Sequence, residues 1–185
     1  MEETFPPMET ERLILRRFTD ADLEPLLAYR NDPGVARYQS WESCDEDDAR
    51  HLIAAVKSLR PGMPGRWLQV AVELRETREL IGDVAFGVRG DDPSRAEVGF
   101  TFAQVHQGRG YATEAMTRLL RYLFETLNLA HLAAITDSEN RPAAALLNRL
   151  GFRRRGSRPV TFKGRPARED RHSLSREEWR QTVPR

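Results

Sequence analysis

Two glycines, Gly108 and Gly110, lie in residues 107–113, between a run that favours a β-strand and a long amphipathic helix. Glycine lets the backbone approach a ligand closely and adopt positive φ angles. A helix that begins here presents backbone N–H groups without intrahelical partners, and the positive end of its dipole, to an anion. The spacing therefore predicts a loop that binds an anionic group such as a diphosphate.

Two other phosphate-binding motifs fit this segment less well. A dinucleotide fingerprint would have a third glycine where Thr113 stands, and it would follow a parallel strand, whereas the preceding strands read as antiparallel. The chain contains no Gly-x-x-x-x-Gly-Lys-Ser/Thr string, so it lacks the phosphate loop of nucleotide hydrolases. A plain turn before a helix remains the simplest alternative for a short glycine loop.

The strands and helices that must position the loop are predicted from the spacing of the hydrophobic residues and from helix-capping patterns. Strands are predicted over residues 12–16, 67–74, 80–88, 96–102 and 131–136, with a final hairpin around residues 163–165. Helices are predicted over residues 19–29, 43–59, 112–123 and 141–150, the second from a capping box of Ser43 and Glu46. Short turns between residues 67 and 102 imply an antiparallel meander. This order predicts an α/β domain with a mixed sheet.

Length and composition narrow the class of protein. The 185 residues suit one domain, expected to span residues 1–185, and 29 basic against 28 acidic side chains give a net charge of only +1. A single cysteine, Cys44, excludes an intramolecular disulfide and a cysteine metal cluster. No apolar run reaches the ~18 residues of a membrane span, and the N-terminus is acidic rather than basic. A cytoplasmic location without membrane partners is therefore expected.

Several blocks of the sequence resemble the GNAT N-acetyltransferases, in particular their RimJ/RimL-type branch. In the glycine loop, Gln107, Gly110 and Ala112 match the acyl-CoA motif Gln/Arg-x-x-Gly-x-Gly/Ala. The other blocks are ETERLILR (residues 9–16), AEVGF (96–100), Asn140 with LGF (150–152), and LSREEW (174–179). The resemblance implies a GNAT fold with a mostly antiparallel sheet of about seven strands and about four helices. It also implies acetyl-CoA as co-substrate and direct acetyl transfer to an amine.

The resemblance further implies which residues hold acetyl-CoA. The extended arm of the cofactor would pair with the strand before the loop, and backbone N–H groups of residues 108–113 would hold its diphosphate. Asn140 matches the family asparagine near the sulfur, although a helix cap explains it equally well. Arg109 would add charge or simply be solvated. The expected cofactor-binding residues are Phe100, Thr101, Phe102, Gln107, Gly108, Arg109, Gly110, Tyr111, Ala112, Thr113 and Asn140, and no metal site is expected.

Glu97 is the expected catalytic residue. An amine must lose a proton before it attacks a thioester, and a carboxylate or an ordered water can accept that proton. Strand alternation places Glu97 on the face opposite Ala96 and Val98, where a solvated surface residue is the other interpretation. Leu147 and Ala143 stand where the family often has a tyrosine or serine that protonates the CoA thiolate. The proton donor is therefore left unassigned, with water as one candidate.

Acceptor recognition is the part on which the sequence is least informative. Tyr38 and Trp41, near the acidic residues 45–48, are expected to bind the substrate amine, although lid or core packing and helix capping would explain the same residues. The expected acceptor is a protein N-terminal amine or a small amine such as a polyamine or aminoglycoside. A catalytically silent acyl-CoA-binding or protein-interaction module is the alternative. An RNA-binding protein, led by the basic residues 153–168, is a third hypothesis, and homodimerisation is left open.

Overall fold

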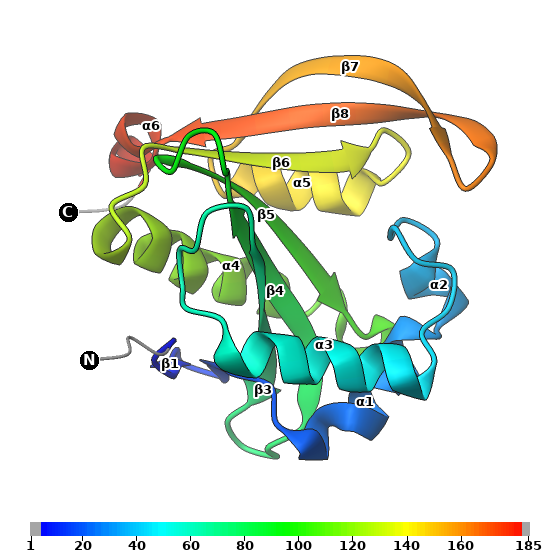
Figure 1. Ribbon diagram of the computed structural model, residues 1–185. Coiled ribbons are helices and arrows are strands. Elements are labelled where there is room, and N and C mark those ends of the chain that lie inside the picture. Colours follow the sequence, from blue (N-terminus) through cyan, green and yellow to red (C-terminus); the bar gives the residue numbers. More distant parts are fainter. Residues whose placement is uncertain (1–4, 183–185) are drawn as a thin grey trace.

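The computed structural model describes residues 5–182, whose strands form one eight-stranded sheet in the order β1-β2-β3-β4-β5-β6-β8-β7 (Figure 1). Every pair of neighbouring strands is antiparallel except β5 and β6. The strands are β1 (Met8–Glu9), β2 (Leu13–Arg16), β3 (Trp67–Leu74), β4 (Leu80–Val88), β5 (Arg95–Phe102), β6 (His131–Asp137), β7 (Arg153–Phe162) and β8 (Arg165–Ser175).

Helices pack on both faces of this sheet. On one face, Tyr29 of α1 donates a hydrogen bond to Asp83 of β4, and on the other, the ring of Tyr122 packs against Phe86 of the same strand. Successive side chains of a strand point to opposite faces, so residues 83 and 86, three positions apart, make these contacts on opposite faces of the sheet. The helices are η1 (Asp20–Asp22), α1 (Leu23–Arg30), α2 (Pro33–Ala36), α3 (Glu46–Ser58), η2 (Gln104–His106), α4 (Tyr111–Arg121), η3 (Tyr122–Thr126), α5 (Arg141–Arg149) and α6 (Arg176–Thr182).

The parallel pair β5 and β6 separates along its length, as Figure 1 shows. Their pairing covers only three positions and ends where Glu97 faces Ala133, whereas β5 continues to Phe102 and β6 to Asp137. Beyond Glu97, β5 keeps its hydrogen bonds to β4, but no strand of residues 5–182 pairs with its other edge. The sheet therefore splits open at the point where β5 leads into the glycine loop, and exposes backbone donors and acceptors there.

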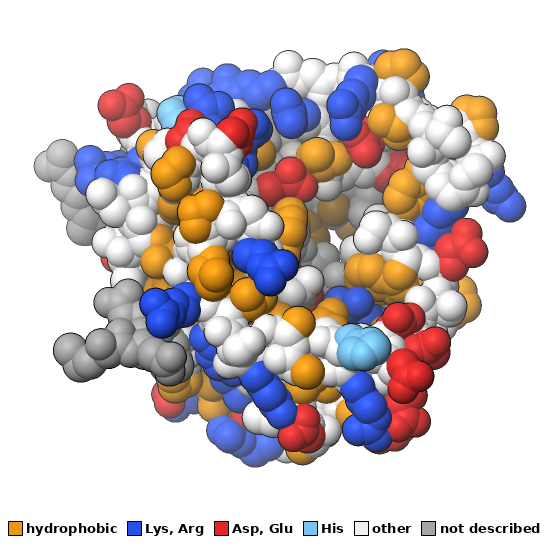
Figure 2. Space-filling model, viewed as in Figure 1, with side chains coloured by type: hydrophobic (Ala, Val, Ile, Leu, Met, Phe, Trp, Pro, Cys, Tyr) orange, Lys and Arg blue, Asp and Glu red, His pale blue; other side chains and the backbone are white. Residues whose placement is uncertain are grey.

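A long hairpin of β7 and β8 extends beyond the split, and its tip contacts residues 36–41, which we call, together with α2, the α2 segment. At its tip, Lys163 donates hydrogen bonds to the carbonyl oxygens of Ala36 (2.8 Å) and Trp41 (2.6 Å). The basic side chains gather over this hairpin in Figure 2. Several of them are paired with acids, in the ion pairs Arg153–Glu178, Arg154–Asp170, Arg155–Glu178 and Arg158–Glu169. This pairing weakens the electrostatic basis for nucleic-acid binding by the hairpin.

The predicted α/β fold with a mostly antiparallel mixed sheet is confirmed, and three details differ. The sheet has eight strands rather than about seven, because the two-residue strand β1 pairs with β2. The described residues contain six α-helices rather than about four, because α2 and α6 were not predicted. The predicted capping box at Ser43 was wrong: α3 is capped by Asp45, which accepts a hydrogen bond from the Asp48 backbone N–H (2.8 Å).

Candidate active site

The glycine loop presents a continuous row of unpaired backbone donors. Gly108 and Gly110 both have positive φ angles, +74° and +83°, and α4 begins directly after them at Tyr111. The first N–H of this segment that bonds within the protein is that of Glu114, which donates to the Gly110 carbonyl (3.0 Å). Within residues 5–182, the N–H groups of residues 108–113 have no acceptor. Such a row at a helix N-terminus is suited to an anion.

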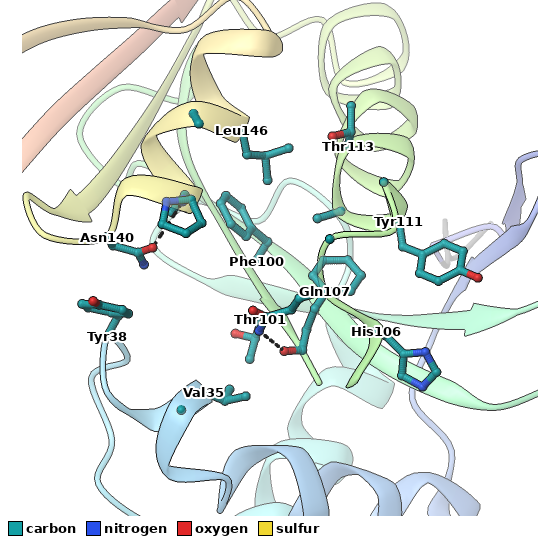
Figure 3. Close-up of a pocket in the computed structure, with 18 of the residues that line it drawn as sticks. Val35, Tyr38, Phe100, Thr101, His106, Gln107, Tyr111, Thr113, Asn140 and Leu146 are labelled. Atoms are coloured by element: carbon teal, nitrogen blue, oxygen red, sulfur yellow. Dashed lines mark hydrogen bonds between the residues drawn. The ribbon is translucent and has the colours of Figure 1, made fainter. Parts of the chain in front are cut away.

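Except for Arg109, the residues that carry these donors line a cavity of about 630 Å³, which we call the first cavity (Figure 3). Its walls come from the α2 segment, the end of β5, the glycine loop and α5, as the labelled residues in the figure show. Most of the predicted cofactor residues line it, namely Phe100, Thr101, Phe102, Gln107, Gly108, Gly110, Tyr111, Ala112, Thr113 and Asn140. Arg109 is not among its lining residues. Its carbonyl instead accepts a hydrogen bond from the Arg12 guanidinium (3.1 Å).

Gln107 and Asn140 each brace the wall of the first cavity through a side-chain amide. The Gln107 Nε2 donates to the Phe102 carbonyl (2.9 Å), which ties the loop to the end of β5. The Asn140 Oδ1 accepts from the Ala143 N–H (3.2 Å) and caps α5, so the capping role that the sequence allowed is confirmed. Leu147 is fully buried in the core, and Ala143 lines the cavity without a proton to donate. Neither position supplies an acid.

Glu114 anchors the glycine loop, a role that the sequence did not reveal. Its carboxylate accepts hydrogen bonds from the Thr10 hydroxyl (2.6 Å), the Arg12 backbone N–H (2.8 Å) and the Arg12 Nε (2.7 Å). The same arginine lies over the Tyr111 ring, 4.5 Å from its centroid. Burial raises the pKa of Glu114, but the bonds from Thr10 and Arg12 outweigh it and leave that pKa below its usual value. The loop is thus fixed to the segment before β2.

A second cavity of about 510 Å³ adjoins the first at Tyr38, Gln39, Phe100 and Thr101, which line both. It occupies the split between β5 and β6, and the β7–β8 hairpin contributes Val160, Phe162 and Ala167 to it. In Figure 2 the surface is hollowed below that hairpin. The two predicted substrate residues meet it differently: Tyr38 lies at the junction of the cavities, whereas Trp41 lines the second cavity alone.

Glu97 points into the second cavity, on the face opposite the buried Ala96 and Val98, as its strand alternation predicted. Within the described part of the chain, no hydrogen bond or ion pair engages its carboxylate, which is half-buried. Burial raises the pKa of Glu97 above its ordinary value, and the positive charge of Arg171 opposes part of that shift. A carboxylate with free oxygens and a raised pKa is suited to accept a proton.

Three neighbours in and beside the second cavity were missed by sequence reasoning: Tyr29, Arg30 and Asp83. Asp83 is buried opposite Thr101 in the β4–β5 register and accepts a hydrogen bond from the Tyr29 hydroxyl (2.5 Å). Burial raises the pKa values of both groups. The Arg30 guanidinium lies over the Trp41 ring, 4.2 Å from its centroid. These residues come from α1 and β4, which carry no local motif that could have identified them.

Residues 5–182 contain no group of three or more His, Cys, Asp or Glu side chains that could hold a metal ion. No helix in the same range has the length and apolar character needed to cross a membrane.

Known proteins are similar to this chain in sequence and in fold. The N-acetyltransferase p20 of Bacillus licheniformis is 34% identical over 148 residues, which cover 80% of this chain and 82% of that protein. The [ribosomal protein uS5]-alanine N-acetyltransferase of Escherichia coli is 32% identical over 157 residues, 80% of this chain and 79% of that one. The spermidine N-acetyltransferase of Vibrio cholerae, solved with CoA and spermine, superimposes with a TM-score of 0.79 and 24% identity. The superposition covers 92% of this chain and 99% of that one.

The profile of the acetyltransferase (GNAT) domain matches residues 12–153, a span that runs from Arg12 beside the glycine loop to the start of the β7–β8 hairpin. It therefore includes both cavities' principal walls, the row of unpaired N–H groups and Glu97. The fold, the loop and this match agree, and the chain belongs to the GNAT acetyltransferase family.

Proposed function

We propose that this acyltransferase moves an acetyl group from acetyl-CoA directly to a primary amine. The observation that carries the proposal is the row of unpaired N–H groups at residues 108–113 in a cavity that joins a second, carboxylate-lined cavity. If the diphosphate of acetyl-CoA lies in the first cavity and the amine in the second, the thioester carbon and the amine nitrogen would meet near Phe100 and Thr101, which line both cavities. The spermidine N-acetyltransferase of the same fold, which was solved in complex with both CoA and spermine, supports a site that takes a cofactor and an amine together.

The cofactor would be held mainly by backbone groups. One edge of β5 from Val98 to Phe102 has no neighbouring strand in the described part of the chain, so N–H and C=O groups on that edge can pair with the amides of the extended cofactor arm. The diphosphate would accept hydrogen bonds from the loop N–H groups, assisted by the dipole of α4. Asn140, which caps α5 at the cavity wall, would contact the arm near the sulfur.

Glu97 would accept the proton that the amine must lose, directly or through a water molecule. The new N–C bond then forms as the C–S bond of the thioester breaks, and the CoA thiolate takes up a proton. With Leu147 and Ala143 at the family's acid positions, solvent would supply that proton, which is feasible because a thiol has a pKa of only about 8.5. Catalysis would then depend largely on holding the two reactants in place.

Because Glu114 fixes the glycine loop, its substitution is expected to lower the affinity for acetyl-CoA and to leave the rate of the chemical step unchanged. Glu114→Gln removes the ion pair with Arg12 that fixes the loop, so we expect acetyl-CoA affinity to fall about fivefold, or about 1 kcal/mol, with kcat nearly unchanged. Titration calorimetry measures the affinity. Glu46→Gln, which breaks the exposed pair with Arg50, is the matched control. Equal affinities of Glu114→Gln and the wild type would show that the anchor does not support the loop.

The acceptor class would be identified by CoA thiol release across a panel of amines. The E. coli relative acts on the alanine of ribosomal protein uS5, and the Vibrio neighbour on spermidine, so the panel contains N-terminal peptides, polyamines and aminoglycosides. We expect turnover on one of these classes at a rate that saturates with amine concentration. If no amine of the panel made CoA release faster than it is without an amine, the proposed function would be contradicted.

A catalytically silent acyl-CoA-binding module is the second candidate, and one observation favours it. The positions of the usual tyrosine and serine acids hold Leu147, which is buried, and Ala143. Such a module would bind acetyl-CoA tightly and release no CoA with any amine of the panel. The unengaged carboxylate of Glu97 in the second cavity favours the enzyme instead.

A further inference from the structure

Arg30 is a buried cation in the second cavity whose guanidinium is only partly satisfied by the described residues. The residue is 9% exposed and lines the cavity. Its Nε is buried and has no hydrogen-bond partner. No ion pair joins its guanidinium to a carboxylate within the described residues. Because a buried charge is costly unless it is paired, the unpartnered Nε leaves this guanidinium able to bind a further anionic group in the cavity.

The neighbours of Arg30 hold it in place, and no carboxylate of residues 5–182 forms an ion pair with it. Its guanidinium stacks on the Trp41 ring at 4.2 Å, and the Trp41 Nε1 donates to the Arg30 carbonyl (3.1 Å). The nearest acid, Asp83, has one oxygen engaged by the Tyr29 hydroxyl. Burial raises the pKa values of Tyr29, Cys44 and Asp83, and the positive charge of Arg30 opposes all three shifts, so Asp83 supplies part of its counter-charge. A stacked guanidinium of this kind keeps its edge N–H groups available for a carboxylate.

The second cavity therefore holds a buried guanidinium and, some distance along the strands, the unengaged carboxylate of Glu97. Arg30 lies at the end marked by Asp83, which faces Thr101, whereas Glu97 faces Gly87 four residues away, roughly 13 Å along the sheet. Glu169 adds negative charge near Glu97, whereas Arg171 and Arg89 add positive charge there. A ligand that carries a cationic amine and a separate anion matches both ends. A polyamine would place a second cation toward Arg30, which is unfavourable.

We propose that the acceptor carries a carboxylate in addition to its amine, and that Arg30 binds this carboxylate. The inference rests on the proposed function, because it concerns the amine of that same reaction. The carboxylate could be the terminus of an amino acid or short peptide, or an acidic side chain near a protein N-terminus. Both supply the same planar pair of oxygens, which the fork of a guanidinium binds through two hydrogen bonds.

Two matched pairs of acceptors test the proposal and distinguish the two sources. Dialanine is compared with its C-terminal amide, and alanyl-glutamyl amide with alanyl-glutaminyl amide. We expect the acid of at least one pair to have a kcat/KM about tenfold to a hundredfold higher than its neutral partner, mainly through KM. Arg30→Gln should reduce that ratio to below about threefold. Arg30→Lys, which keeps the charge but loses the fork, should give an intermediate ratio and serves if Arg30→Gln does not fold.

The control variant is Arg50→Gln, which removes an exposed cation of α3 and should keep the wild-type ratio. Thermal unfolding and acetyl-CoA affinity establish that each variant is folded. An active wild type with no preference for either acid would overturn the inference and leave the proposed function standing. A preference that persists in Arg30→Gln would also overturn it, because Arg30 would then serve only as a counter-charge to Asp83. A wild type that uses no amine at all would contradict both proposals.

Discussion

Gly110→Trp should bind acetyl-CoA at least about a hundredfold more weakly than the wild type, a loss of about 2.7 kcal/mol. Gly110 has a φ of +83°, which costs a residue with a side chain about 1–2 kcal/mol, so the loop would shift away from the geometry that presents its N–H groups. A Cβ at this position would also lie 3.3 Å from the Arg12 guanidinium, and the indole would compete with the ligand for the first cavity. Titration calorimetry measures the change.

The matched control is Gly164→Trp in the turn of the β7–β8 hairpin. Gly164 has a similar φ of +72°, and a Cβ there would meet no atom within 4 Å. The two variants therefore share the backbone strain but not the position. We expect Gly164→Trp to retain the wild-type affinity for acetyl-CoA. Wild-type affinity in Gly110→Trp would mean that the cofactor binds elsewhere.

Glu97→Gln should lower kcat by about 10²- to 10³-fold, the usual contribution of a positioned general base, with the affinity for acetyl-CoA unchanged. Because burial raises the pKa of Glu97, the wild-type kcat/KM should fall with decreasing pH through a value above the ~4.3 of an ordinary glutamate. Activity is present above that pKa, where the carboxylate is ionised, and is lost below it. The variant should lose this acidic limb of the profile.

The control for this variant is Glu76→Gln, an exposed glutamate in the turn between β3 and β4. It should keep both the rate and the pH profile of the wild type. If Glu97→Gln retained the wild-type rate and the acidic limb, another group would be accepting the proton. Asp83 would then be the next carboxylate to test, because it lines the same cavity.

The parts of the site that the sequence predicted depend on local chemistry. The glycine loop was identifiable because positive φ angles at Gly108 and Gly110 and the N-terminus of α4 lie within a few residues of one another. Glu97 was identifiable because strand period fixes which face a residue occupies. The same reasoning predicted most strands of the sheet and their antiparallel order.

The parts of the site that the sequence did not predict depend on contacts between segments that lie far apart in the sequence. Glu114 bonds to Thr10, 104 positions away, and Tyr29 to Asp83, 54 positions away, so neither pair leaves a local pattern. The capping error has a different cause. Ser43 with Glu46 and Asp45 with Asp48 both satisfy a capping pattern, and only the path of the chain before α3 selects the second pair.

The most direct test of the proposed reaction follows isotope-labelled acetyl groups from acetyl-CoA into the acceptor. The wild type is incubated with labelled acetyl-CoA and each amine of the panel, and the amines are then analysed by mass spectrometry. We predict that one amine class gains a single labelled acetyl group on nitrogen, in step with the CoA released. Tight binding of acetyl-CoA with no label on any amine would contradict the account and favour the silent module.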